Sequence, residues 1–415
     1  MILDFTAPFV PQYAALPEDL NALDLNNNSL GMQTKAKLIE AFSAIPARIT
    51  SLNLSRNNLD SLGSADLVSA FKAIPEQITT LNLAYNLAGY TGSELAALFA
   101  AIPPGVTFLD LAGNNLGALS SEELAIAFAA LPAGVTSINL GFNNLYRCTD
   151  NGLAKAFAAI PARVRSVNLN YNDLGTRSCI ELTAAFKALP RSLTSLELGA
   201  NALGTLKGDE LGKALVALPA GITSLDLSRN ALGTRSRDEL IATFKALQKS
   251  GVLSLNLGGN KLGLRTGIEL MAVFAVLSER ITSLNLSVND LNNCSGAEIA
   301  KAFAALPASV TSLNLKDNQL NDKTELALIT LLKTLPDTVT SVTIDGTSQI
   351  QIQSGLQKNV EVIRQQNLCP RVTNIMFDLV GINSRYSWWT KPVDTSKEEK
   401  QSTETKGLST NAISL

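Results

Sequence analysis

The chain has 415 residues, enough for two or three ordinary domains, and is 46% hydrophobic but only 5% aromatic. Such a composition favours a core built from many similar small aliphatic units. Because 34 basic residues oppose 36 acidic ones, no charged footprint for nucleic acid or an anionic membrane is expected. The absence of histidine excludes serine–histidine–aspartate and cysteine–histidine catalysis and histidine metal sites. Carboxylate, lysine or tyrosine chemistry stays open, but we predict no enzyme, metal or cofactor.

The first nineteen residues precede any repetition and are predicted to form an N-terminal cap (residues 1–19). They contain Asp4 and no basic segment, so we expect no signal peptide. No stretch of eighteen uncharged apolar residues occurs, and therefore no membrane insertion is expected. The four cysteines are widely spaced without a C-x-x-C pair, which favours a reduced compartment over a disulfide scaffold.

An internal repeat begins near residue 20. The segment from Ile49 to Leu59, ITSLNLSRNNL, has the pattern L-x-x-L-x-L-x-x-N-x-L, in which Ile or Val can replace Leu. Its asparagine recurs every 28 to 30 residues, at Asn28, Asn57, Asn86, Asn114, Asn143, Asn172, Asn201, Asn230, Asn260, Asn289 and Asn318. A degenerate twelfth copy starts at Val339. Residues 20–347 are thus predicted to contain about 12 repeats of 29 residues.

The second half of each repeat has helical periodicity. In SEELAIAFAALP, the apolar residues Leu124, Phe128 and Leu131 share one helix face, and Pro132 ends the helix. Strands stack ~4.8 Å apart, whereas helices need roughly 10 Å each. The predicted fold class is therefore α/β: a solenoid curved into a horseshoe, with parallel strands on the concave face and helices on the convex face.

The motif asparagines are predicted to be structural, since their amides can bond backbone groups that no sheet partner reaches. Along each strand, Leu52 and Leu54 point into the core, so Ser51 and Asn53 face outward. The outward columns are monotonous, mostly Ser at one position and Asn or Asp at the other. We expect hydrogen-bonded cross-strand ladders there, which give a partner little to recognise.

Departures from this monotony identify candidate partner-binding residues. Tyr, Phe and Arg dominate interface energetics, and they occur where neighbouring repeats carry small or polar residues. Several of them are expected to gather on repeats three to six, although the rings could instead pack on one another. The predicted partner-binding residues are Arg56, Tyr85, Phe108, Phe142, Tyr146, Arg165, Tyr171 and Arg229.

Beyond the repeats, residues 348–390 are predicted to form a C-terminal cap. Gln349–Asn367 contains an amphipathic helix pattern, and Arg371–Leu379 is an apolar run. Trp388 and Trp389 could pin the cap or form a second contact site. Residues 391–415 are rich in Glu, Ser and Thr, so a disordered solubilising tail is one interpretation of them.

The repeat pattern resembles the ribonuclease-inhibitor-like class of leucine-rich-repeat proteins. That resemblance implies a horseshoe that binds proteins through its concave face. The uniform V-T-S-L-N-L units with AFAALP helices look like the repeat effectors that intracellular bacterial pathogens inject into host cells. In that context the tail, with Glu398, Glu399 and Glu404 and with Ile413 near the end, resembles a type IV secretion signal.

The sequence hence predicts a monomeric, non-catalytic interaction module. Its implied partner is a host protein or another effector, and its implied location is the host cell cytoplasm. The alternative is a scaffold or inhibitor that acts in the cytoplasm of its own cell.

Overall fold

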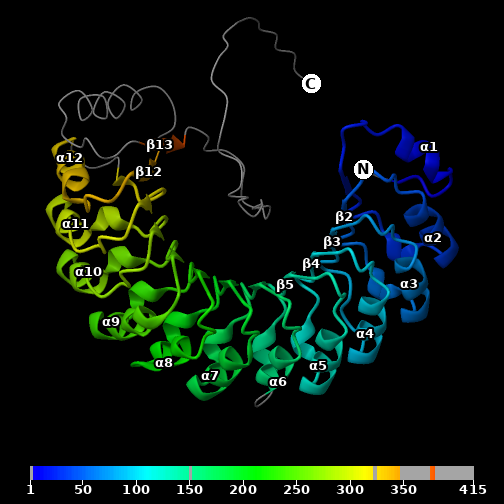
Figure 1. Ribbon diagram of the computed structural model, residues 1–415, viewed down its shortest axis with the longest axis horizontal. Coiled ribbons are helices and arrows are strands. Elements are labelled where there is room, and N and C mark those ends of the chain that lie inside the picture. Colours follow the sequence, from blue (N-terminus) through cyan, green and yellow to red (C-terminus); the bar gives the residue numbers. More distant parts are fainter. Residues whose placement is uncertain (1–2, 149–151, 321–324, 346–373, 379–415) are drawn as a thin grey trace, which may run out of the picture. The chain divides into compact units, whose positions relative to one another are not determined.

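The computed structural model describes residues 3–148, 152–320, 325–345 and 374–378. The chain forms two compact units, Met1–Leu379 and Val380–Leu415, and every described residue belongs to the first. Within that unit, short strands and helices alternate, with the strands along the inner side of a curve and the helices along its outer side (Figure 1).

The described strands form one parallel sheet in chain order, and each of them pairs with the strand of the next repeat. Leu23 is level with Leu52, and Leu52 with Leu81, so equivalent residues of every repeat lie side by side. The strands are β1 Ala22–Asp24, β2 Ser51–Asn53, β3 Thr80–Asn82, β4 Phe108–Asp110, β5 Ser137–Asn139, β6 Ser166–Asn168, β7 Ser195–Glu197, β8 Ser224–Asp226, β9 Ser254–Asn256, β10 Ser283–Asn285, β11 Ser312–Asn314, β12 Ser341–Asp345 and β13 Asn374–Asp378.

Each repeat returns along the outer side through an α-helix, mostly preceded by a 3₁₀ turn. The α-helices are α1 Phe9–Ala14, α2 Lys35–Ser43, α3 Ser64–Phe71, α4 Gly92–Ala100, α5 Ser121–Ala129, α6 Gly152–Ala158, α7 Cys179–Ala188, α8 Glu210–Val216, α9 Arg237–Ala246, α10 Gly267–Phe274, α11 Gly296–Phe303 and α12 Glu325–Thr334. The 3₁₀ helices are η1 Leu30–Met32, η2 Leu59–Ser61, η3 Leu116–Ala118, η4 Leu145–Arg147, η5 Leu174–Thr176, η6 Leu203–Thr205, η7 Leu232–Thr234, η8 Leu247–Lys249, η9 Leu262–Leu264 and η10 Leu291–Asn293.

Local sequence determines where these helices begin. Ser120 precedes α5, and its hydroxyl accepts a hydrogen bond from the Glu123 amide, while the Glu123 carboxylate accepts one from the Ser120 amide. This capping box satisfies two amides that no helical turn can reach. The same Ser/Thr-x-x-Glu arrangement precedes α4, α7, α9, α10 and α11.

The core lies between the sheet and the helices, as the repeat pattern predicts. Strand leucines such as Leu52 and Leu81 are buried from one side. From the other side a column of fully buried rings packs against them, and Leu215 and Leu332 occupy the same position in two repeats. The rings are Phe42, Phe71, Phe99, Phe128, Phe157, Phe186, Phe244, Phe274 and Phe303.

The motif asparagines form a buried ladder at the end of the sheet. The Nδ2 atom of Asn143 donates to the carbonyls of Leu111 (2.9 Å) and Gly141 (3.2 Å). Its Oδ1 atom accepts the amides of Asn114 (2.9 Å) and Leu116 (3.3 Å) in the preceding repeat. The Asn143 amide in turn donates to Oδ1 of Asn172 (3.0 Å). The predicted structural role of these asparagines is therefore confirmed.

Both ends of the array have additional structure. Phe9 and Tyr13 of α1 are buried, and the Leu3 amide donates to Oδ1 of Asn28 (2.7 Å), which occupies the first ladder position. At the other end, the apolar run Arg371–Leu379 supplies β13, a strand beyond the twelve expected repeats that pairs in parallel with β12. The predicted helix of Gln349–Asn367, both tryptophans and the tail lie outside the described residues.

Candidate functional site

The residue before each motif asparagine adopts a left-handed backbone conformation. Five predicted binding residues occupy this position: Arg56 (φ 57°), Tyr85 (58°), Phe142 (56°), Tyr171 (56°) and Arg229 (55°). This conformation costs an L-amino acid roughly 1–2 kcal/mol, whereas glycine adopts it freely. Repeats four and nine carry Gly113 and Gly259 here, and repeat seven carries Ala200. The turn thus needs no bulky side chain, and large side chains at a strained position favour a functional role.

These five residues, which we call the aromatic row, make contacts in two groups along the array: Arg56 with Tyr85, and Phe142 with Tyr171 and Arg229. The guanidinium carbon of Arg56 lies 4.1 Å from the centre of the Tyr85 ring. The rings of Phe142 and Tyr171 are stacked, with centroids 4.1 Å apart and planes inclined by 10°. Arg229 donates from Nη1 to the hydroxyl of Tyr171 (3.2 Å), although repeat seven lies between them. The rings of Phe142 and Tyr171 therefore pack on one another, which is the alternative that the sequence left open.

Small residues in the same column leave space for the large ones to lie flat. A Cβ atom on Gly113 would lie 2.3 Å from Cε1 of Tyr85, so the Tyr85 ring covers this glycine. Likewise, a Cβ atom on Gly259 would lie 2.9 Å from Cγ of Arg229. Arg56, Tyr85 and Arg229 remain exposed, whereas Phe142 and Tyr171 are half-buried. The row is thus ordered by its own contacts and still accessible.

The structure places the other three predicted residues elsewhere. Phe108 is the first residue of β4 and lies half-buried on the sheet face, level with Thr80 and Ser137. Arg165 directly precedes β6, at the opposite end of the strand from Tyr171. Tyr146 belongs to η4, beyond the motif asparagine. The residues expected to gather on repeats three to six thus lie on those repeats, but at different levels of the strands and turns.

The polar side chains that face outward from the sheet form most of their hydrogen bonds with other groups of this chain. The Asn53 side chain donates across the sheet to Oδ1 of Asp24 (2.9 Å), as the predicted ladder requires. Its own Oδ1 atom accepts the amide of Ser55, two residues further on (3.0 Å). The same short-range bond recurs at most repeats, for instance from Gly141 to Asn139 (2.9 Å). Because these groups already have partners, the column gives a ligand few free acceptors.

Two carboxylates on the sheet face are partly desolvated. Burial raises the pKa of Asp110, against hydrogen bonds from the Ala112 amide and the Asn139 side chain. Burial, together with the nearby charge of Asp226, also raises the pKa of Glu197. Nδ2 of Asn170 donates to Glu197 (2.9 Å). No group of three or more Cys, Asp or Glu suited to hold a metal occurs in the described part of the chain.

Sequence reasoning missed a second set of arginines, in the loops before the helices. The Arg235 side chain is almost fully buried; it donates to the carbonyls of Leu206 and Gly208 in the preceding repeat and pairs with Glu239 (3.8 Å). Arg177 makes the same kind of bridge, to Tyr146 and Glu181. The Arg-x-x-x-Glu spacing was visible in the sequence, but it is also common on exposed helix ends. These arginines join adjacent loops and are structural.

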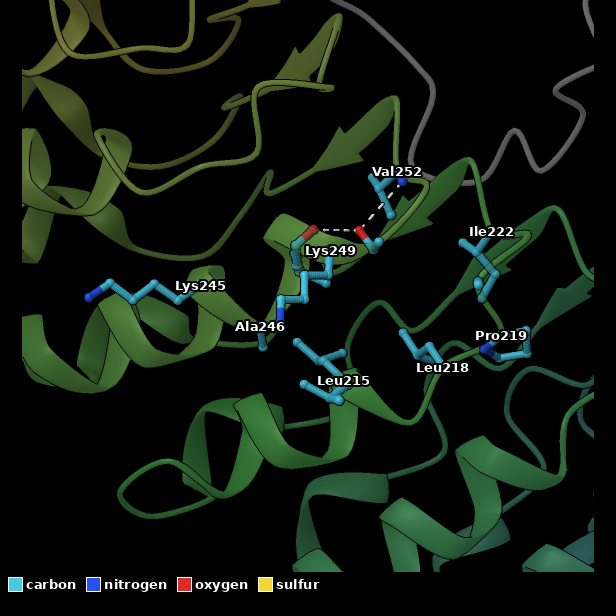
Figure 2. A pocket seen from close by; sticks show the side chains of 12 residues that line it. Leu215, Leu218, Pro219, Ile222, Lys245, Ala246, Lys249 and Val252 are labelled. Carbon is cyan, nitrogen blue, oxygen red and sulfur yellow. Dashed lines mark hydrogen bonds between the residues drawn. The ribbon is translucent and has the colours of Figure 1, made fainter.

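A pocket of about 320 Å³ lies between repeats seven and eight (Figure 2). Leu215, Leu218 and Pro219 line it from repeat seven, and Ile222, Lys245, Ala246 and Lys249 line it from repeat eight. Leu215 stands where most repeats carry phenylalanine, and Gln248 stands where most carry the helix-ending proline. The chain there forms the extra turn η8, so the pocket arises where two repeats depart from the pattern.

Repeated strand–turn–helix units, a single parallel sheet and a buried asparagine ladder together define a leucine-rich-repeat solenoid. The crystal structure of the leucine-rich repeat-containing protein LegL7 from Legionella pneumophila is similar, with 30% sequence identity and a TM-score of 0.61. The match covers 81% of this chain and 94% of that one. The chain belongs to the leucine-rich-repeat family, and its fold is that of a protein-interaction module.

Other comparisons add less. A chain in the crystal structure of the Rad7 and Elc1 complex in yeast matches with 16% identity and a TM-score of 0.39, over 76% of this chain and 84% of that one. No protein-family model matches the sequence, and no curated protein does. Among the described residues, no helix is both long enough and apolar enough to cross a membrane.

Proposed function

We propose that this protein is a non-catalytic binding module whose partner protein docks on the aromatic row. The observation that carries the proposal is that Arg56, Tyr85, Phe142, Tyr171 and Arg229 are held by mutual contacts at a backbone position where glycine would be unstrained. Ordered aromatic and arginine side chains lose little conformational freedom on binding, which is why they dominate protein interfaces.

The other surfaces of the repeat array are less suited to bind a partner than the aromatic row, which supports the proposed docking site. The outward column of the sheet is engaged in bonds within the chain, such as that between Asn53 and Asp24. On the helical side, exposed apolar residues such as Ile126, Ile180 and Val216 lie on different helices. Phe108, Tyr146 and Arg165 lie at other levels of repeats four, five and six and would extend a contact made on the row.

We also propose that the protein acts after delivery into a host cell by type IV secretion, as a monomer that binds a host protein or another effector. The likeness to a bacterial leucine-rich-repeat protein supports this role, as does the Glu-, Ser- and Thr-rich C-terminal segment. The alternative is a scaffold or inhibitor within the producing cell. Deleting the last twenty residues and measuring transfer into host cells separates the two, because only a secreted effector loses transfer.

The docking proposal is tested with partner captured by cross-linking to the full chain and then purified. Tyr171→Ala and Phe142→Ala should each weaken its binding about thirty-fold, because truncating an aromatic anchor commonly costs about 2 kcal/mol or more. Lys261→Ala, an exposed residue of repeat nine, is the control and should leave affinity unchanged. Thermal unfolding of each variant verifies that the array is intact. Equal affinities of all three variants would place the partner elsewhere.

A further inference from the structure

Among the described residues, the two arginines of the aromatic row have no carboxylate partner, unlike several other arginines of this chain. Arg177, Arg235 and Arg265 each pair with a glutamate four residues further on. Within the described residues, neither Arg56 nor Arg229 forms an ion pair, and both are exposed. Their charges are therefore not neutralised within the described part of the chain.

Both arginines are nevertheless held in place. Arg56 lies on the face of Tyr85, and Tyr85 in turn covers Gly113. Arg229 lies over Gly259 and donates to the Tyr171 hydroxyl through Nη1. A guanidinium has five N–H donors in a rigid plane, which matches the two oxygens of a carboxylate. When a guanidinium stacks on a ring, the N–H groups at its edges can still donate hydrogen bonds. Because the side chain is already held in place, it loses less conformational entropy on binding.

The spacing of these groups sets the length of what they could bind. Arg56 belongs to repeat two and Arg229 to repeat eight, so six strand spacings of ~4.8 Å separate their Cα atoms by about 29 Å. The guanidinium groups lie closer together, because that of Arg56 lies on Tyr85 of repeat three and that of Arg229 reaches Tyr171 of repeat six. The stacked pair Phe142 and Tyr171 lies between them, on repeats five and six. The row thus offers a cation at each end and an apolar platform near its middle.

The acidic residues of the neighbouring sheet face do not cancel this pattern. Oδ1 of Asp110 accepts the amide of Ala112, and Oδ1 of Asp226 accepts the amide of Ser228. Glu197 accepts a bond from Asn170, and its burial disfavours the charged form. The three carboxylates are therefore engaged on the sheet itself, whereas the two arginines are exposed and have no ion-pair partner among the described residues.

We infer that the partner presents an acidic segment to the row: carboxylates near both ends, no more than about 29 Å apart, with an apolar side chain between them. This inference rests on the proposed function and specifies the chemistry of its partner. Arg56 and Arg229 each bind a carboxylate through two N–H groups, while the apolar side chain packs on Phe142 and Tyr171. A basic or uncharged segment would leave both arginines without a counter-charge and would bind more weakly.

The test uses the full chain and a synthetic helical peptide of about 20 residues, which spans about 29 Å. One peptide carries glutamate pairs at both ends and a central leucine and tryptophan, and a second carries lysine in place of glutamate. Fluorescence anisotropy should show binding of the glutamate peptide that weakens from about 0.05 to 0.5 M salt, as charge attraction is screened. The lysine peptide should bind at least tenfold more weakly. Failure of the glutamate peptide to bind, or equal binding of both, overturns the inference.

Variants of the protein locate the interaction. Arg56→Glu and Arg229→Glu should each weaken binding of the glutamate peptide tenfold or more. Arg191→Glu is the matched control, because it makes the same change of charge at an exposed residue of the loop before β7, and should leave the affinity within about threefold. Gly113→Ala should also weaken binding without any change of charge, since its Cβ atom would displace Tyr85 from beneath Arg56. An equal loss in Arg191→Glu would show attraction by net charge alone.

The purified partner distinguishes this inference from the proposed function. If Tyr171→Ala weakens partner binding but Arg56→Glu and Arg229→Glu do not, the row binds the partner and the acidic chemistry is wrong. If none of these changes affects partner binding, the proposed docking site fails together with the inference.

Discussion

Replacing Asn143 by alanine tests the physical basis of the array. Its side chain is fully buried and makes four hydrogen bonds to the backbone. The two carbonyls that it contacts keep other donors: Leu111 also accepts from Nδ2 of Asn114, and Gly141 also accepts from the Gly113 amide. The amides of Asn114 and Leu116 have no other acceptor among the bonds found in this structure. The cost of the substitution is thus concentrated in two buried amides.

Leaving a buried donor unsatisfied costs about 1–3 kcal/mol, so Asn143→Ala should lower the free energy of unfolding by about 2–6 kcal/mol. Asn144→Ala is the matched control. Asn144 is the next residue, is exposed, and adopts a conformation that alanine already occupies at the equivalent positions 202 and 231. Its replacement removes one exposed bond, from Nδ2 to Oδ1 of Asn115 (3.2 Å), and should lower the free energy of unfolding by no more than about 1 kcal/mol.

Urea unfolding followed by circular dichroism compares the two variants, and native-state hydrogen exchange of the Asn114 and Leu116 amides localises the effect. Because repeat arrays can unfold in parts, the exchange measurement matters when the unfolding curve broadens. Coincident unfolding midpoints for Asn143→Ala and Asn144→Ala, with unchanged exchange of the two amides, would refute the reasoning.

Three further predictions concern the core, the pocket and the sheet face. Phe128→Ala should cost about 3–5 kcal/mol, because it removes a fully buried ring, and a thermal melt within a degree of the unmodified chain would contradict this. Leu215→Phe restores the residue that other repeats carry and should fill part of the 320 Å³ pocket; calorimetry should show a higher unfolding temperature, and a lower one would mean overpacking. Because burial raises the folded-state pKa of Glu197, the protonated form favours folding, and this contribution is lost as pH rises from the unfolded pKa through the folded one. Glu197→Gln should therefore stabilise the chain at pH 7 and flatten its stability across the acidic range, as measured by urea titrations at several pH values.

The fold could be predicted because the same pattern of buried and exposed positions recurs in every repeat. Leu52 and its equivalents alternate with polar residues on most strands, and the phenylalanines recur at one helix position, so any error in register would repeat in each copy. The motif asparagine was predictable for the same reason. A buried amide beside a turn must bond the backbone, and the structure shows these bonds from Asn57 to Asn318.

The candidate site was only partly predictable. A sequence pattern shows which residues occupy equivalent positions in successive repeats, but it does not show which side chains contact one another. Tyr85, Phe142 and Tyr171 could be assigned to one column by counting from the motif asparagine. That Arg229 reaches Tyr171 across Ala200 depends on rotamers and on the small residue between them. Phe108 and Arg165 were grouped with Tyr85, Phe142 and Tyr171 because all of them lie on repeats three to six. A three-residue strand and its turn are nevertheless long enough to separate them.

The same asparagine ladder that stabilises the array also explains why the row can vary. Each motif asparagine is held by bonds between asparagine side chains and the backbone, and the preceding residue adopts the left-handed conformation whatever its own side chain is. Glycine, alanine, asparagine, aspartate, valine, arginine, tyrosine and phenylalanine all occur there in the described repeats. Stability therefore constrains this column little beyond the cost of its backbone angle. A position that the scaffold holds rigidly but does not use for packing is well suited to present side chains to a partner, because their order comes from the backbone and from one another.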